Sequence, residues 1–285
     1  MEDVQELRAE LSATPPAEVG IQSGAWLVEL SLDWIVLRAS ENVHHLVGQS
    51  HVTLIDEPFG RFVHAQALHD LRNLFSRLSG STGIARAYGV RLTDDPDLVD
   101  IAFHLGNGKV LLEAVPSTGA FGEAFGTVGG LVDGLANSRG QALIDGGARR
   151  MRALTGYDRV TFSIGDRGAE SSRSNFLGPA EDSTDFPALI ADAQAPAVAI
   201  FPRDGEDAAA AIALMRQPSE AVLGQLATSG IRATLCVPFG VGGVEGQFRC
   251  DCRTVRAPSF EVHAAAELFA QMFALRLEMD ALNNG

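Results

Sequence analysis

The residues of this sequence best suited to chemistry are its three cysteines, Cys236, Cys250 and Cys252, which lie close together near the C-terminal end. Thiolates can bind zinc, exchange disulfides or form a thioether with a prosthetic group. Each of these reactions needs the sulfur atoms to reach the right place. The local structure around the cysteines therefore decides which of these reactions the chain could carry out.

Two apolar runs surround the cysteines, at residues 231–239 and 244–252, and the glycine-rich segment 240–243 separates them. This pattern predicts two strands of a β-hairpin, with Phe239 expected to lie opposite Val244.

Side chains alternate between the two faces of a strand, so residues two apart share a face. Thr234, Cys236 and Asp251 are then expected on one face, and Cys250 and Cys252 on the other. This parity argues against a three-cysteine metal site. A redox pair of Cys250 and Cys252 would be strained, and covalent attachment of a group at Cys236 competes with an ordinary buried cysteine.

Other catalytic patterns are weak. The segment 240–246 is similar to a phosphate loop, but it joins two strands and contains no lysine, so we interpret it as a turn. Serine, histidine and aspartate are all present without a Gly-x-Ser-x-Gly context. The histidines of the N-terminal part are not spaced as metal ligands; they are His44, His45, His51, His64 and His69. We expect neither an enzyme nor a metal site.

The composition sets further bounds. A chain of 285 residues can bury the cores of two domains, and 46% hydrophobic with 20% charged residues is typical of a globular protein. A net charge of −14 argues against a nucleic-acid partner, because phosphate binding needs clustered lysine and arginine. No apolar run is long enough to span a membrane, and the acidic N-terminus is unlike a signal peptide. We therefore expect a cytoplasmic protein.

The N-terminal half reads as a small antiparallel sheet with helices. We expect a helix over residues 1–11, and Ser40 as the cap of a short helix that reaches Val47. A helical stripe of apolar residues covers 64–78. The expected strands are 25–30, 34–38, 84–92, 99–105 and 110–115.

The C-terminal half begins with a glycine-rich link at 117–127. We expect a helix over 128–155 that is interrupted at Gly140 and at Gly146-Gly147, then a strand from Tyr157 and a polar loop over 165–181. Further expected elements are helices at 186–193, 208–215 and 218–227 and a strand at 197–201. Residues 260–282 form a long helix with a wide apolar face, which favours a role in dimerisation or signalling.

Four segments resemble one known family. Residues 21–25 and 39–43 are similar to the opening of the PAS domain of bacterial phytochromes. Residues 154–160 resemble the start of their GAF domain, and 230–234 and 266–273 resemble a later strand and the final helix of that domain. The segments occur in the order and spacing of the family.

The resemblance implies an α+β fold with two domains, PAS then GAF, each an antiparallel sheet flanked by helices. The implied boundaries are an N-terminal segment 1–20, a PAS domain 21–116, a linker and helix 117–139, and a GAF domain 140–285 that ends in the long helix. The family often threads its N-terminal segment through a GAF loop as a figure-of-eight knot. That loop, about residues 203–214, is short here.

The family binds a linear tetrapyrrole, usually biliverdin, and the implied pocket positions are altered in this chain. The attachment cysteine that normally precedes the PAS domain is missing. Two histidines of the pocket fall on Val222 and Asp251, and aromatic positions fall on Ser163, Gln225 and Glu181; a second propionate-binding arginine falls near Ala199 or Ile200. The remnant pocket positions are Asp185, Pro187, Arg216, Ser219, Thr234, Cys236 and Asp251.

These losses compound, since a bilin needs a thiolate, aromatic walls and donors for its ring nitrogens. Asp251 and Glu181 would also place negative charge beside anionic propionates. We therefore expect a non-enzymatic, phytochrome-like sensory protein without a covalent chromophore and with no cofactor, which acts through a homodimer of the C-terminal helix or through a signalling partner. The alternatives are a sensor that binds a non-covalent tetrapyrrole, such as biliverdin, or another small molecule, and the input half of a longer kinase.

Overall fold

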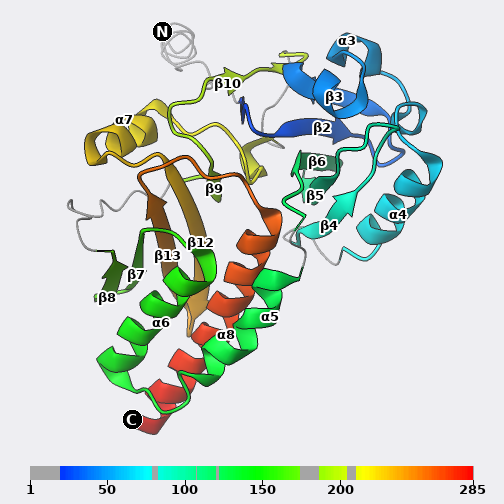
Figure 1. Ribbon diagram of the computed structural model, residues 1–285. Helices are drawn as coiled ribbons and strands as arrows, with labels where there is room; N and C mark the ends of the chain where they lie inside the picture. Colours follow the sequence, from blue (N-terminus) through cyan, green and yellow to red (C-terminus); the bar gives the residue numbers. More distant parts are fainter. Residues whose placement is uncertain are drawn as a thin grey trace, which may run out of the picture.

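The computed structural model describes residues 20–78, 83–106, 108–119, 122–173, 186–203 and 210–284. Two large antiparallel sheets, of six and five strands, lie side by side, each with helices packed on it, and a long helix ends the chain (Figure 1). The expected α+β class with two sheets and a long final helix is confirmed. The helix expected over residues 1–11 lies outside the described residues.

The N-terminal sheet has the strand order β11-β3-β2-β6-β5-β4. Its own strands are β2 (Trp26–Leu30), β3 (Val36–Ser40), β4 (Ala85–Val90), β5 (Val99–Gly106) and β6 (Lys109–Pro116). One face packs under α2 (His44–Val47), α3 (His51–Leu54), α4 (Ala65–Phe75) and the 3₁₀ turns η1 (Glu41–Val43) and η2 (Phe59–Arg61). Alternation then sends Leu27, Ala102 and Leu111 to the opposite face, where they join the core of the C-terminal half.

Ser40 does not act as the cap that we expected. Its Oγ accepts a hydrogen bond from the backbone N of Leu27 at 3.1 Å, and the turn that follows has no side-chain cap. The hydroxyl therefore ties β3 to its neighbour strand instead of ending a helix.

The C-terminal sheet has the order β8-β7-β13-β12-β9. Its strands are β7 (Arg159–Ile164), β8 (Arg167–Ser172), β9 (Leu189–Ile190), β12 (Ala233–Val241) and β13 (Val244–Cys252). The helices α5 (Glu123–Asp133), α6 (Gly140–Thr155) and α8 (Phe260–Asn284) form a layer on one face, and α7 (Glu220–Ser229) lies near one end of the sheet (Figure 1). The core of this layer is a cluster of aromatic rings: Phe162, Phe239, Phe248, Phe269 and Phe273.

The register of the hairpin differs from the expected one by two residues. Val241 pairs with Val244, and only Gly242 and Gly243, with φ of 55° and 81°, form the turn. Two successive positive φ angles are typical of the tight turn that glycine allows between twisted strands. A shift of two residues preserves parity, so the predicted division of the cysteines between the two faces is confirmed.

Gly146 and Gly147 lie inside an uninterrupted α6, where we expected a break. A Cβ added at Gly147 would lie 2.5 Å from the ring of Phe273, and one at Gly146 would lie 2.7 Å from Leu135. These glycines therefore allow α8 and the end of α5 to approach closely, a tertiary reason that local propensity does not contain. Residues 123–127 of the expected link are already helical in α5.

Three further predictions between 165 and 215 are wrong. Residues 167–172 form strand β8 rather than part of a loop, and the expected helix at 186–193 is the short strand β9. Only the 3₁₀ turn η3 (Ala210–Ile212) occurs in the described part of the helix expected over 208–215. β9 exists because Leu189 and Ile190 pair with Leu235 and Thr234, which are distant in sequence.

The two halves exchange segments. β11 (Ile200–Phe201), from the C-terminal half, pairs with β3 and extends the N-terminal sheet. β1 (Ile21–Gln22) pairs with β10 (Ala197–Val198) on one side and forms a bridge from Ile21 to Arg216 on the other. The first described residues thus lie between two limbs of the C-terminal half. The sequence left the presence of the knot open, and residues 204–209 of its loop lie outside the described residues.

Within the described ranges, none of the helices combines the length and the apolar character that crossing a membrane requires.

Candidate functional site

One face of the C-terminal sheet carries a buried network of charged side chains. Asp251 on β13 accepts hydrogen bonds from Arg159 on β7, at 3.2 Å from Nε and 2.9 Å from Nη2, both to Oδ2. Its Oδ1 accepts from Nε of Arg249 at 3.0 Å and from the hydroxyl of Thr234 at 3.3 Å. All four residues are less than a tenth exposed. We call these four residues the ion network and their side of the sheet the ligand face.

The ion network follows from strand parity. Arg159 pairs with Asp251 across β7 and β13, and Thr234 pairs with Asp251 across β12 and β13, so their side chains share one face. Arg249 precedes Asp251 by two residues and points to the same side.

Because the network is buried, the pairing of its charges affects the stability of the fold. Taking a guanidinium or carboxylate out of water is costly, and removing one partner of such a pair typically costs about 3–5 kcal/mol. Asp251 forms ion pairs with both arginines of this network. The carboxylate of Asp251 is thus paired within the sheet.

Apolar groups cover the rest of this face near the network. The guanidinium carbon of Arg249 lies 4.2 Å from the ring centroid of Phe186, a cation–π distance. Val222 is 2% exposed and belongs to a small cluster with Ile190, Leu226 and Ile231, against which Phe186 packs. Val222, at a position where the resemblance implies a histidine, therefore serves packing.

The cysteines are buried on both faces. Cys236 lies on the ligand face with its N–H donated to the carbonyl of Ala188, and burial raises the pKa of its thiol to about 12. Cys250 lies in the core of the helix face, where burial raises the pKa of its thiol well above the usual value; burial also raises the pKa of Cys252. In the ranges that the structure describes, no group of three or more His, Cys, Asp or Glu side chains could hold a metal ion.

The remaining remnant positions do not converge on the ion network. Ser219 is exposed and caps α7, its Oγ accepting from the N–H of Val222 at 3.4 Å. Arg216 is half-buried beside Ile21, and Pro187 is buried next to Phe186. Asp185 and Glu181 lie outside the described residues.

A cavity of about 540 Å³ lies on the sheet toward the hairpin turn. Its lining includes Ser163, Pro238 and Gln247, which alternation places on the ligand face, and also Glu245 at the rim. This volume is in the usual range for small-molecule pockets.

A second polar cluster joins the two halves of the chain. Glu113 on β6 accepts from the N–H groups of Leu214 and Met215, at 2.7 and 2.9 Å, and lies 2.7 Å from Nε2 of His104. Gln22 similarly donates to the carbonyls of Leu189 and Arg216. These buried side chains satisfy backbone groups of the opposite half.

At the same junction Arg86 on β4 donates to Nδ1 of His263 at 3.0 Å and pairs with Glu267 at 2.7 Å, both on α8. Burial, with Arg86 and His104 nearby, lowers the pKa of His263 to about 3. Burial raises the pKa of Glu267, against the opposing effect of Arg86. The histidine is thus held neutral as an acceptor for Arg86.

Sequence reasoning missed Arg159 and Arg249, although a signal existed. The predicted strand from Tyr157 and the predicted hairpin both alternate, so the same parity that grouped Thr234 with Asp251 would have added both arginines. The junction residues Glu113 and His104 carry a weaker signal, a polar residue inside an otherwise apolar strand.

No family model matches the chain, and no curated protein matches it in sequence. Solved structures do match. The chromophore-binding domain of a Stigmatella aurantiaca phytochrome has a TM-score of 0.74 at 21% identity, covering 93% of this chain and 97% of that one. The chromophore-binding domain of a bacteriophytochrome from R. palustris has a TM-score of 0.76 at 21% identity, covering 94% and 98%.

The chain spans only part of a longer neighbour. Against the photosensory core module of the Stigmatella phytochrome it has a TM-score of 0.78 at 21% identity, covering 95% of this chain and 60% of the module. At such identity the likeness concerns the fold, and it confirms the PAS–GAF fold that the sequence segments indicated. The N-terminal sheet is therefore the PAS sheet, and the C-terminal sheet is the GAF sheet.

Proposed function

We propose that this chain is a non-enzymatic, phytochrome-like sensory or adaptor protein that no longer attaches a bilin covalently and that acts through contact with other protein chains. The observation that carries this proposal is the ion network on the ligand face. Arg159 and Asp251 are each 1% exposed or less, and they occupy the surface against which a tetrapyrrole would have to lie. A ligand there would have to displace buried, mutually paired charges.

The chemistry of attachment supports the same conclusion. A thioether forms from a thiolate, and the sequence contains no cysteine before Cys236. With a thiol pKa of about 12, the thiolate of Cys236 amounts to about 10⁻⁴ of the total at pH 8. Cys236 is the one cysteine on the ligand face, and it is poorly suited to the reaction.

Incubation with biliverdin tests this proposal. The expected spectrum is that of the free pigment, without a sharp red band or photoconversion, and the intact mass of the protein is expected to stay unchanged. A photoconverting red band would contradict the proposal, and a mass increase of one biliverdin would contradict the loss of attachment in particular.

The exposed side of α8 supports a second copy of this chain as the partner. Leu268, Leu275, Met279 and Leu282 are 39%, 61%, 57% and 83% exposed, and Met272 is half-buried. Together these five residues alternate in steps of four and three, the a/d pattern of a coiled coil, and we call them the α8 stripe. Exposed apolar rows of this kind mark helix–helix interfaces.

The mass in solution tests the dimer. Light scattering is expected to give twice the chain mass for the wild type, and L275E is expected to halve it. The matched control A281E adds the same charge on α8 outside the stripe and is expected to leave the dimer intact. A wild-type monomer, or a dimer in L275E, would contradict this partner.

A second candidate function is a sensor that holds a non-covalent tetrapyrrole or another small molecule. The observation that favours it is the cavity of about 540 Å³ on the sheet beside Ser163 and Gln247. In the biliverdin experiment this candidate is distinguished by a shifted absorption band with unchanged protein mass.

A further inference from the structure

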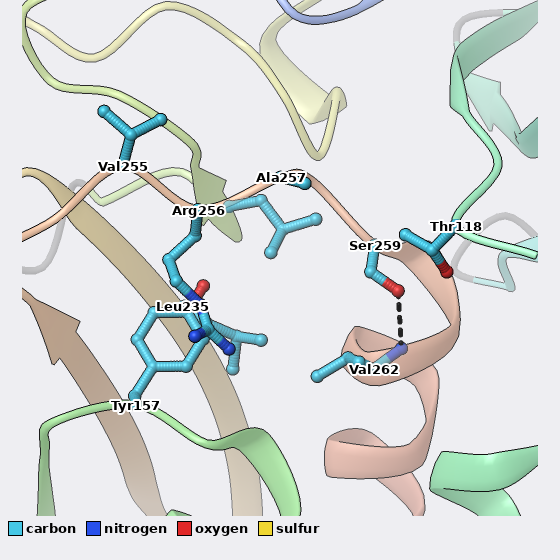
Figure 2. A pocket seen from close by; sticks show the side chains of 9 residues that line it. Thr118, Tyr157, Leu235, Val255, Arg256, Ala257, Ser259 and Val262 are labelled. Atoms are coloured by element: carbon cyan, nitrogen blue, oxygen red, sulfur yellow. Dashed lines mark hydrogen bonds between the residues drawn. The ribbon is translucent and has the colours of Figure 1, made fainter. Parts of the chain in front are cut away.

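A different cavity, of about 380 Å³, lies at the start of α8 on the helix side of the GAF sheet (Figure 2). Three segments meet there: the end of the PAS sheet at Thr118, the β12 residue Leu235, and the loop that leads through Arg256 into α8. Leu235 points to the face opposite Thr234 and Cys236, so the sheet separates this cavity from the ligand face.

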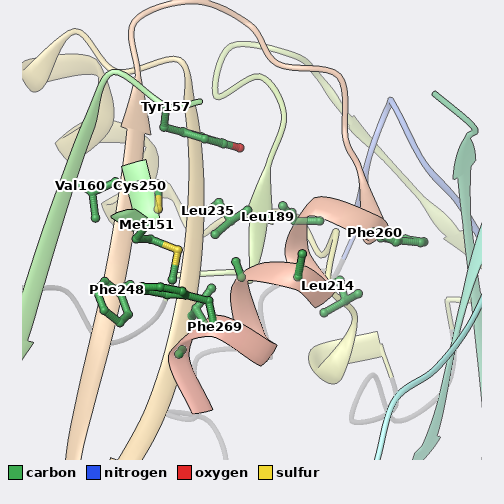
Figure 3. Close-up of a cluster of buried hydrophobic side chains, with 14 of the residues drawn as sticks. Met151, Tyr157, Val160, Leu189, Leu214, Leu235, Phe248, Cys250, Phe260 and Phe269 are labelled. Carbon is green, nitrogen blue, oxygen red and sulfur yellow. The ribbon is translucent and has the colours of Figure 1, made fainter. Parts of the chain in front are cut away.

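Tyr157 contributes a polar group, its hydroxyl, to the lining of this cavity. The side chain is 5% exposed, and its hydroxyl makes no hydrogen bond with any residue that the structure describes. Figure 3 shows the ring above Leu235 and Leu189, with the hydroxyl directed away from Val160. Burial raises the pKa of the phenol, so it remains a neutral donor. The hydroxyl oxygen is accessible from the cavity, where it can donate to a ligand acceptor.

Arg256 places a cation beside that hydroxyl. Its guanidinium carbon lies 5.0 Å from the ring centroid of Tyr157, and one Nη donates to the carbonyl of Thr155 at 3.0 Å. The loop is held by the N–H of Arg256, which donates to the carbonyl of Ala191 at 3.0 Å. Among the described residues no carboxylate forms an ion pair with this half-buried guanidinium, so it retains donors for an anion.

The other walls are apolar or already occupied. Leu189 and Leu235 are 3% and 1% exposed, and Val262 is half-buried. The hydroxyl of Ser259 accepts from the N–H of Val262 at 3.2 Å, as the dashed line in Figure 2 marks. The cavity thus pairs a cation and a hydroxyl at one end with an apolar wall, the composition of a pocket for a small amphipathic anion.

We propose that this cavity is a second ligand site, which binds a small monocarboxylate with a compact apolar body, its carboxylate on Arg256 and Tyr157 and its body on Leu189 and Leu235. An adjoining cavity of about 430 Å³ contains the carboxylates Glu123 and Glu261. Oε1 of Glu261 accepts from the N–H groups of Gly122 and Ala124, and the negative charge on this side disfavours a second carboxylate on the ligand.

A ligand in this cavity would contact residues of both the PAS and the GAF domain. Thr118 follows the last strand of the PAS sheet, and Ser259 and Val262 belong to the start of α8, which also carries the α8 stripe. The proposal does not depend on what the ligand face binds, because the two sites lie on opposite sides of the sheet.

Calorimetric titration of the whole chain with benzoate tests the proposal. Benzyl alcohol, which has the same ring without the charge, and inorganic phosphate, which has charge without the ring, are the matched probes. Saturable one-to-one binding of benzoate, at least about tenfold tighter than that of either probe, is expected because hydrogen bonds to charged groups are the stronger ones. Absence of saturable benzoate binding, or equal binding of benzyl alcohol, would overturn the proposal.

Variants locate the site. R256Q is expected to weaken benzoate binding at least about tenfold, and Y157F several-fold with little change in packing. A257F fills the cavity from its exposed rim and is expected to abolish binding, whereas the exposed control R167Q on β8 is expected to bind as the wild type does. If R256Q does not fold, Y157F and A257F decide; wild-type affinity in both would overturn the proposal.

Discussion

The two faces of the GAF sheet are built from alternate residues of the same strands, yet they are stabilised in opposite ways. On the helix face Phe248 lies between 5.1 and 6.1 Å, centroid to centroid, from the rings of Phe162, Phe239, Phe269 and Phe273. On the ligand face, one residue along β13, Arg249 begins a network in which Asp251 is 0% exposed. One face is an apolar core, and the other is a paired set of buried charges.

The difference shows what each kind of buried sheet face requires for stability. The helix face is stabilised by apolar area removed from water, which needs only correct size and pattern. The ligand face depends on particular pairs, because a buried charge without its partner is costly. Substitutions on the two faces should therefore differ in how far a second substitution can compensate for the first.

The largest expected effect is on the helix face. F248A removes a ring that is 0% exposed and contacts four others, and it is expected to lower the free energy of unfolding by about 3–5 kcal/mol. Urea denaturation measures this change. The control V244A, at an exposed position of the same strand, is expected to change it by less than about 0.5 kcal/mol. A loss below about 1.5 kcal/mol in F248A would show that the face is loosely packed.

The second prediction concerns the end of the helix layer that meets the PAS sheet, where His263 interrupts the apolar pattern. Its pKa is about 3 in the folded chain, whereas the unfolded chain protonates near 6.5, so the unfolded state takes up the proton first as pH falls. The contribution is present in full above pH 6.5 and is lost progressively toward pH 3. Between pH 6.5 and 5 the wild type is expected to lose about 2 kcal/mol that H263N does not lose.

Denaturation curves at several pH values measure that difference. H263N retains an acceptor for Arg86, so the comparison isolates the titration from the lost contact. Glu267 and His104, the other titratable groups near this position, are unchanged in both proteins. H69N, on the exposed side of α4, is the control and is expected to follow the wild type. Parallel curves for the wild type and H263N would contradict a buried neutral histidine.

The sequence predicted the parts of this comparison that depend on local alternation. The PAS strands and the hairpin alternate clearly, α8 is long and apolar, and parity alone separated Cys236 from Cys250. The register could not be found in this way, because the segment 240–243 allows a turn of four residues as well as the observed turn at Gly242-Gly243.

Other elements are specified by distant partners. β9 and β11 have two residues each, and they exist because Ile190 pairs with Thr234 and Ile200 pairs with Ser40. Gly147 stays helical because Phe273 packs against it from another helix. Ser219 was assigned to a pocket through the resemblance, whereas its hydroxyl caps α7. In each case the deciding contact joins residues that no local window contains.

The smallest expected effect is at that cap. S219A is expected to lower the free energy of unfolding by about 1 kcal/mol, because the N–H of Val222 loses its acceptor. S219D keeps an acceptor and is expected to recover most of the loss. Thermal unfolding of the three proteins measures both changes. Equal stability of S219A and the wild type would contradict a structural role for this hydroxyl.

The coupling energy between Arg159 and Asp251 tests most directly whether the ligand face is closed by its own charges. It is obtained from the unfolding free energies of the wild type, R159M, D251L and the double variant. A buried network is expected to give a coupling of about 2–4 kcal/mol, with the double variant more stable than at least one single variant. A coupling below about 0.5 kcal/mol, as exposed ion pairs give, would contradict a closed face and would favour an open pocket.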